Sequence, residues 1–351
     1  MIQLGVDQHK RFSQMAALDT ETGVVTEARL DHDDPEAIRG FVASLGPEVM
    51  ASMETTGNWY WLVDLLEDVG AQVQLANTIE TRRLLKARAK NDRLDAVALA
   101  VLSSEGILPR VYLPARAQRD ERERHRFRIR LIAVQTVLKN IAHSILGKLN
   151  VATPFSDMFG KAGRAYLDGL QLREPYESQL RSILRLLDAI RPEVERATRE
   201  IVHWAREDPL AGLLQTVPGV AELTAYLILH EVGPVERFPT HKQFVSYCCL
   251  APGTWQSAAK HRDLPVGRHG NLYLKAAMTG AVPAAVRKDP TLARYYARTT
   301  RRKGKSTALV ATARRLAVAV YYMLKQRRPY QPPGQSNTRV GKPRLCLGHS
   351  R

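Results

Sequence analysis

The stretch Ile2-Gln3-Leu4-Gly5-Val6-Asp7 begins the chain with a short apolar run that ends on a carboxylate. Residues 2–7 and 14–19 have the composition of strands, and residues 23–30 give a third. The turn Thr20-Glu21-Thr22-Gly23 connects the second strand to the third. The sequence therefore predicts an antiparallel meander of three strands.

Helices and strands alternate after this meander. We predict, in order, a helix over 34–45, a buried strand over 49–53, a helix over 58–69 with Asn58 as its N-cap, a strand over 71–75, and helices over 78–89 and 91–105. A meander followed by alternating helices and strands is the order of the ribonuclease-H-like fold, and other α/β folds share parts of it. We place this α/β domain at residues 1–113.

Long, charged, helix-favouring sequence follows, and we assign residues 114–209 to a coiled-coil helical segment. Apolar residues recur at alternating spacings of three and four, which predicts two heptad seams. The first comprises Phe127, Leu131, Val134, Leu138, Ile141, Ile145 and Leu149, and the second Leu180, Ile183, Leu187, Ile190, Val194, Ala197, Ile201 and Trp204. Pro192 is expected to kink or restart the second helix. The seams can pack on each other or on another subunit, and their spacing does not choose between these.

The remaining sequence divides into a compact region and a tail. Residues 210–328 are mostly helical in pattern and punctuated by Gly and Pro, so we assign them to a C-terminal all-α domain. Residues 329–351 are rich in Pro, Gly and basic residues, which predicts a basic, disordered tail.

Composition excludes several classes of protein. No uninterrupted apolar run approaches the roughly 20 residues that cross a bilayer, and the first residues lack a signal-peptide pattern, so we expect a cytoplasmic protein with no membrane partner. The three cysteines are Cys248, Cys249 and Cys346, and their spacing indicates neither a disulfide framework nor a zinc site.

The charge is distributed unevenly. Residues 1–113 hold 11 basic and 17 acidic residues, which leaves 41 basic and 18 acidic residues for 114–351. An acidic module joined to one with a net charge of +23 suits metal-dependent phosphate chemistry held against nucleic acid, because Lys and Arg neutralise backbone phosphates. A basic protein of another kind would show the same charge, so the charge alone leaves the function open.

Four carboxylates form the candidate catalytic and metal site. Asp7 and Glu54 each end an apolar strand, so both can emerge at one edge of a sheet. Asp92 and Asp95 lie three residues apart on one face of a predicted helix. Oxygen ligands of this kind suit Mg²⁺ or Mn²⁺, and two such ions about 4 Å apart can support phosphodiester cleavage. The competing interpretations are capping or turn roles for each carboxylate, and a sugar kinase, whose strand can also end in Gly-Val-Asp.

Candidate nucleic-acid contacts are concentrated in the second half. The turn Thr216-Val-Pro-Gly219-Val220 before an apolar helix is similar to a helix-hairpin-helix element, in which Gly219 would approach a phosphate, although Pro-Gly is also a common turn. The predicted contacts are Gly219, Lys260, Arg262, Arg268, Arg302 and Lys303. Ser257 lies in a loop of small residues before this basic cluster, where a serine is most often a turn residue. No neighbouring His and Asp indicate a hydrolase triad.

Taken together, these motifs resemble the Piv-like DEDD transposases, the IS110 group of insertion-sequence transposases and recombinases. The resemblance is carried by Gly5-Val6-Asp7, Glu54-Thr-Thr-Gly57 and Lys90-Asn-Asp92-Arg-Leu-Asp95 in the first half, and by Thr216–Val220, Gln256-Ser257, Gly270-Asn271 and 303–316 in the second. It covers nearly the whole chain.

The resemblance implies a bacterial DNA transposase with a RuvC-like domain, whose acidic positions are Asp7, Glu54, Asp92 and Asp95, and with Ser257 as a serine nucleophile. It also implies donor and target DNA, a non-coding bridge RNA and a homo-oligomer, a dimer or a tetramer, as partners. Many relatives have Gly after the serine, where this chain has Ala258. The alternatives are a RuvC-like junction-resolving nuclease, which would not need Ser257, and a non-catalytic nucleic-acid-binding protein. The sugar kinase is disfavoured, because its second half should be another α/β domain.

Overall fold

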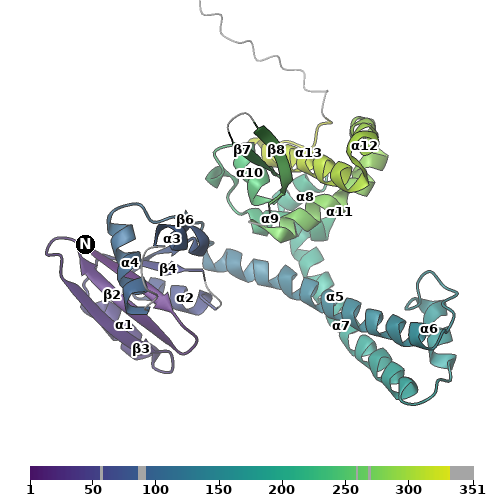
Figure 1. The fold of residues 1–351 in the computed structure, drawn as a ribbon, viewed down its shortest axis with the longest axis horizontal. Coiled ribbons are helices and arrows are strands. Elements are labelled where there is room, and N and C mark those ends of the chain that lie inside the picture. The colour runs from purple at the N-terminus through teal and green to yellow at the C-terminus, as the bar shows by residue number, and fades with distance from the viewer. Residues whose placement is uncertain (56–57, 86–91, 258–259, 268–269, 333–351) are drawn as a thin grey trace, which may run out of the picture. The chain divides into compact units, whose positions relative to one another are not determined.

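The computed structural model describes residues 1–55, 58–85, 92–257, 260–267 and 270–332 (Figure 1). The chain forms two compact units, Met1–Arg116 and Ala117–Arg351. The first is a mixed α/β unit and the second is almost entirely helical.

A six-stranded sheet organises the first unit, in the order β3-β2-β1-β4-β5-β6. Its strands are β1 (Ile2–Gln8), β2 (Phe12–Asp19), β3 (Val25–Asp31), β4 (Val49–Glu54), β5 (Gln72–Ala76) and β6 (Arg110–Val111). The first three form the expected antiparallel meander, and β1, β4 and β5 run parallel. β6 was not predicted, because two residues are too few to show a period.

Helices cover both faces of this sheet. Leu4 and Val6 pack with α1 (Pro35–Ser44) and α2 (Tyr60–Asp68) in one core. Since neighbouring side chains of a strand point to opposite faces, Gly5 faces the other layer, where α4 (Asp92–Ser104) lies against it. Buried polar groups also attach α4 to the sheet: Ser103 accepts a hydrogen bond from Gln74, which donates another, of 2.7 Å, to Ser52.

Two local predictions in this unit were wrong. α2 begins after Trp59, and no side chain caps it, so Asn58 is not the N-cap. The backbone carbonyl of Asn58 instead accepts a hydrogen bond from Gln8. The helix predicted over 78–89 is α3 (Thr78–Leu84), which ends earlier, and residues 86–91 lie outside the described part of the chain.

Three helices form the first part of the second unit: α5 (Arg116–Lys148), α6 (Lys161–Gly169) and α7 (Tyr176–Glu207). The C-terminal part of α5 packs with α6 and with the N-terminal half of α7. Pro192 does not restart α7, which is one continuous helix. The apolar residues of α7 pack in two cores. Residues of Leu180–Leu187 belong to the core with α5 and α6, and Ile201 and Ala205 belong to the C-terminal core. This packing offsets the loss of the single backbone hydrogen bond that proline removes.

The first predicted seam is only partly buried. Ile145 is in the core with α6, whereas Phe127, Val134 and Ile141 are about half exposed, at 45%, 47% and 45%. These three residues lie on α5 and leave an apolar stripe on the surface of this single chain.

The C-terminal core is built from helices around α13 (Lys305–Gln326). The other elements are α8 (Pro209–Leu214), α9 (Glu222–Val232), the 3-10 turn η1 (Val235–Arg237), α10 (His241–Tyr247), the hairpin of β7 (Pro252–Ser257) and β8 (Lys260–Val266), α11 (Leu272–Lys288) and α12 (Pro290–Lys303). Among the described helices, only α13 is long and apolar enough to cross a membrane. Half of its apolar window is buried in this core, which explains its composition without a membrane.

Candidate catalytic and nucleic-acid sites

The sheet brings two of the predicted carboxylates to neighbouring strand ends. β1 and β4 are parallel, with Val6 opposite Met53, so Asp7 and Glu54 follow at the same edge. Asp7 is near the end of β1 and Glu54 is the last residue of β4. Both side chains are partly exposed.

Gly5 allows the third carboxylate to approach. A Cβ atom at Gly5 would collide with the backbone carbonyl oxygen of Ala96, and it would lie 2.8 Å from the Ala100 amide nitrogen. α4 can therefore lie directly on β1 only because residue 5 has no side chain. Asp95 immediately precedes Ala96 on this helix, so the contact at Gly5 sets where Asp95 meets the strand ends.

The pKa of Glu54 depends on the neighbouring carboxylates. Burial raises the pKa of the Glu54 carboxyl, and the negative charges of Asp7 and Asp95 raise it further. Arg82 and a hydrogen bond from the hydroxyl of Thr78 oppose this effect without reversing it. Burial is the largest cause of the raised pKa of Glu54, and the charges of Asp7 and Asp95 add to it.

The donor chemistry of these residues fits a hard divalent cation, because carboxylate oxygens are its preferred ligands. Within the described residues, however, no three His, Cys, Asp or Glu side chains lie close enough to hold a metal ion as they stand. Asp92 begins α4, and its side chain lies outside the described part of the structure. Asp7 also has a close neighbour that the sequence did not suggest, since its Oδ2 lies 3.1 Å from Nε2 of His9.

Ser257 lies at the tip of a two-stranded hairpin. It is the last residue of β7, and its cross-strand partner is Lys260, the first residue of β8. Residues 258–259, which include Ala258, lie outside the described residues, as do residues 268–269, which include Arg268. Arg262 is opposite Trp255 in the same hairpin, and the structure describes the backbone, not the side chains, of Lys260, Arg262 and Ser257.

A buried polar cluster lies where the chain leaves this hairpin, and sequence reasoning missed it. The Asn271 side chain caps α11 and donates a 2.6 Å hydrogen bond to the fully buried carboxylate of Glu231. The backbone N–H of Asn271 donates to the carbonyl of Tyr247, at the end of α10. Glu231 also accepts two hydrogen bonds, of 2.7 and 2.9 Å, from Arg126 of α5. Glu231 therefore connects α5 and α9 to the start of α11.

The charge state of this cluster follows from its contacts. Burial alone would raise the pKa of Glu231, but hydrogen bonds from Arg126 and Asn271 outweigh it, so the pKa is lowered and the carboxylate stays ionised. His125, whose Nε2 lies 3.3 Å from Glu231, is buried, and burial lowers its pKa to about 4. His125 is therefore neutral near pH 7. A lone glutamate in the apolar run Leu223–Val232 was the signal that could have revealed this cluster.

The other predicted nucleic-acid residues fall into two groups. Gly219 has a positive φ of 90°, and a Cβ there would collide with the carbonyl oxygen of Ala281 in α11. Close packing thus accounts for this glycine without a phosphate. Arg302 and Lys303 are exposed in the last turn of α12.

Two family models match the chain. One, described as a transposase and named for the DEDD motif and IS110, matches residues 4–150, and the other, described as the transposase IS116/IS110/IS902 family, matches residues 211–297. The chain belongs to the IS110 family of transposases. This confirms the family resemblance drawn from the motifs. It makes the protein a DNA-processing enzyme, and the DEDD domain indicates the use of divalent metal.

Curated relatives agree with this family. The transposase for insertion sequence element IS1111A of Coxiella burnetii is 24% identical over 93% of this chain and 91% of its own length. An uncharacterised 43.6 kDa protein of insertion element IS110 from Streptomyces coelicolor is 32% identical over 41% of this chain and 36% of its own. The pilin gene-inverting protein of Moraxella bovis is 29% identical over 34% of this chain and 38% of its own. This transposase is therefore similar to proteins named for transposition and for DNA inversion.

Proposed function

We propose that this transposase cleaves and rejoins DNA by combining a metal-bound site of Asp7, Glu54, Asp92 and Asp95 with Ser257 as the nucleophile. The observation that carries the proposal is that parallel β1 and β4 end side by side, so that Asp7 and Glu54 lie at one edge of the sheet, and that α4, which carries Asp95, packs directly on β1 at Gly5. Carboxylates held together in this way require positive charge, which Mg²⁺ or Mn²⁺ supplies.

The architecture supports a ribonuclease-H-like, RuvC-like assignment for the first unit. The sheet order β3-β2-β1-β4-β5, with an antiparallel meander and parallel β1, β4 and β5, is the arrangement expected of that fold. Residues 114–209 would form the coiled-coil segment, residues 210–328 the C-terminal transposase domain, and residues 329–351 a basic tail.

The proposed reaction is an exchange of phosphodiester bonds. The Ser257 Oγ attacks a backbone phosphorus, a serine–phosphate bond forms, and the bond to the leaving sugar oxygen breaks. The serine proton is taken up by a base, and the leaving oxygen receives a proton. A hydroxyl of the partner strand reverses the step and releases Ser257. Lys260, Arg262 and Arg268 would neutralise the scissile phosphate.

The four carboxylates would hold the divalent ions, which supply charge stabilisation to the phosphate and activation of the nucleophile. The chain's own groups set the ions' position: Glu54 through β4, Asp7 through β1, and Asp92 and Asp95 through α4. Because no base adjoins Ser257 in sequence, we propose that the acidic site and Ser257 act together, within one chain or between chains.

We also propose RNA guidance and a homo-oligomer. The net charge of +23 over residues 114–351 supports binding of polyanions such as a bridge RNA and DNA. The half-exposed apolar stripe of Phe127, Val134 and Ile141 supports association through α5, because such a stripe is stabilised by burial.

Covalent trapping tests the proposal. The protein is incubated with suicide DNA substrates, and the products are denatured and digested. Mass spectrometry should then find a nucleotide on Ser257. Ser257→Ala should form no adduct, whereas Ser246→Ala, a change at an exposed serine of α10, should form it normally. Strand rejoining by Ser257→Ala would overturn the serine mechanism and favour the junction-resolving nuclease. Recovery of activity on mixing Asp92→Asn with Ser257→Ala would show that chains share the site.

A further inference from the structure

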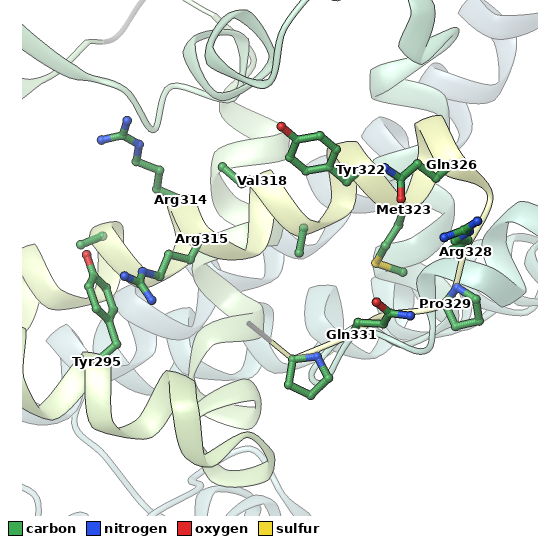
Figure 2. A pocket seen from close by; sticks show the side chains of 13 residues that line it. Tyr295, Arg314, Arg315, Val318, Tyr322, Met323, Gln326, Arg328, Pro329 and Gln331 are labelled. Atoms are coloured by element: carbon green, nitrogen blue, oxygen red, sulfur yellow. The ribbon is translucent and has the colours of Figure 1, made fainter. Parts of the chain in front are cut away.

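A pocket with a volume of about 520 Å³ lies in the second unit, and none of the described residues that line it belongs to the hairpin that carries Ser257 (Figure 2). α12 contributes Tyr295, α13 contributes one side, and residues 328–332 form the remaining wall. This volume lies within the range of roughly 300–1,000 Å³ that is common for small-ligand sites. No role has been assigned to this pocket above.

The segment after α13 is held in place by the side chain and the backbone of Tyr330. The hydroxyl of Tyr330 donates a 2.7 Å hydrogen bond to Asp289, the N-cap of α12. The backbone N–H of Tyr330 donates a 2.9 Å hydrogen bond to the hydroxyl of Thr216. Tyr330 also packs against the C-terminal core. The pocket is therefore preformed and does not depend on a ligand to close its wall.

Positive charge dominates the lining. Arg314, Arg315 and Arg328 line the pocket, and no Asp or Glu is among the lining residues that the structure describes. Across the described residues, none of the ion pairs involves these three arginines. An anionic ligand would therefore meet cations that the protein itself has not neutralised.

Aromatic rings and an amide group line the pocket beside these arginines. The guanidinium carbon of Arg315 lies 3.6 Å from the ring centroid of Tyr295, a cation–π contact that holds the group against the ring. Tyr322 is 42% exposed, although its ring also lies against His241 and its hydroxyl is 3.1 Å from Nδ1 of His241. Figure 2 shows Arg315 turned toward Tyr295, Arg328 at the other end of the pocket, and the amide of Gln331 at its wall. Planar groups and an amide in one pocket match a nucleobase, which has two flat faces and a polar edge.

We infer that this pocket binds one unpaired nucleotide of a single-stranded nucleic acid. The base stacks on Tyr322 or on the Arg315 plane, and the adjoining phosphates contact Arg314 and Arg328. A paired base is excluded, because its faces are covered by its neighbours in the duplex and its edge by its partner. This inference rests on the proposed function only in taking nucleic acid as the polyanion.

Fluorescence anisotropy with 12-nucleotide single strands of DNA and RNA, and with the duplex DNA of the same sequence, tests the inference. Tyr322→Ala should weaken single-strand binding by about fivefold or more, as loss of one stacking ring does, and should leave duplex binding unchanged. Arg315→Lys should also weaken it, because lysine keeps the charge but lacks the plane. Tyr322→Phe should bind normally. Stronger effects with DNA or with RNA identify which strand uses the pocket.

Arg185→Gln, which removes one exposed charge from α7, is the matched control and should change single-strand binding little. Photocrosslinking of the unmutated protein to strands with 5-iodouracil should label peptides that contain Tyr295 or Tyr322. Equal weakening of single-strand and duplex binding, unchanged binding by both variants, or crosslinks only elsewhere would overturn the inference. The binding measurements are repeated in the Ser257→Ala background. Because this variant lacks the proposed nucleophile, it shows whether single-strand binding persists when strand transfer fails.

Discussion

The amide group of Asn271 donates a 2.6 Å hydrogen bond to Glu231, a carboxylate with no exposed surface. Asn271 is the N-cap of α11, and Glu231 of α9 is bonded to Arg126 of α5. The cluster therefore ties the start of α11 to two other helices. Removing its negative charge would leave the buried guanidinium of Arg122, 3.6 Å from Glu231, without this counterion and would weaken the contact with Arg126.

Glu231→Gln should lower the free energy of unfolding by about 3–5 kcal/mol, the cost typical of breaking a buried ion pair. Urea denaturation followed by circular dichroism measures the change. Glu193→Gln is the matched control, because Glu193 pairs with Arg196 on the exposed surface of α7 and such pairs contribute at most about 1 kcal/mol. Equal losses from the two variants would contradict a special role for the buried cluster.

Acidification should destabilise the second unit through His125. Its pKa in the folded protein is about 4, below the unfolded value near 6.5, so the unfolded chain binds more protons between these pH values. Its contribution is therefore fully present above pH 6.5 and is lost as the pH falls toward 4, by up to about 3 kcal/mol. Denaturation at pH 7.5 and pH 5 should show a smaller difference for His125→Gln than for the unmutated protein. The same pH difference in both proteins would disprove this contribution.

Gly5→Ala should displace α4, because the added Cβ would meet the backbone carbonyl of Ala96 and a backbone atom cannot turn aside. The expected loss of stability is about 1–3 kcal/mol, with weaker Mg²⁺-dependent activity as Asp95 moves. Thermal unfolding and a cleavage assay measure the two effects. Gly40→Ala on α1 is the control, since its Cβ would meet no atom within 4 Å and alanine favours a helix. A stable, active Gly5→Ala protein would mean that the contact is not required.

Asp95→Asn should weaken binding of Mg²⁺ or Mn²⁺ and abolish cleavage while the fold remains. The loss of metal affinity should exceed the roughly 10–100-fold loss that is typical when a residue that only orients a metal ligand is removed. Calorimetric titration with Mn²⁺ measures affinity, and Glu105→Gln, one residue beyond α4, removes an exposed carboxylate as the control. Full cleavage in EDTA would rule out the metal site.

Val134→Asp should weaken self-association by about tenfold or more, because it places a charge in the apolar stripe of α5. Val134 is a sharper probe than Leu138, which packs within the core of α5, α6 and α7 and would affect folding as well. Thr136→Asp, at an exposed position of the same helix outside the stripe, is the control. Light scattering gives the mass of each variant. A monomeric, active protein without the substitution would refute the proposed oligomer.

The sheet was predictable because its strands carry strong local signals. The buried run Leu4-Gly5-Val6 and the turn ending at Gly23 fixed the meander, and the described strands differ from the predicted ones by at most two residues at either end. Hydrophobic periodicity also located α5 and α7. It could not locate β6, whose two residues pair with β5 only through the long-range fold.

Contacts between distant residues account for what the sequence could not indicate. Glu231 and Asn271 are 40 residues apart, and Tyr330 reaches Thr216 across 114 residues. No local pattern encodes such pairs. The placement of Asp7 and Glu54 at one edge of the sheet was inferable because parallel strands end at the same edge, whereas the pocket at Tyr295 and Arg315 depends on how α12 meets α13.

Helix α7 continues without a break through Pro192. Its 32 residues extend about 48 Å at the usual rise of about 1.5 Å per residue. Its N-terminal half is packed in the core with α5 and α6, and its C-terminal half is packed in the C-terminal core. Because no break separates the halves, α7 is a rigid connection between these two cores.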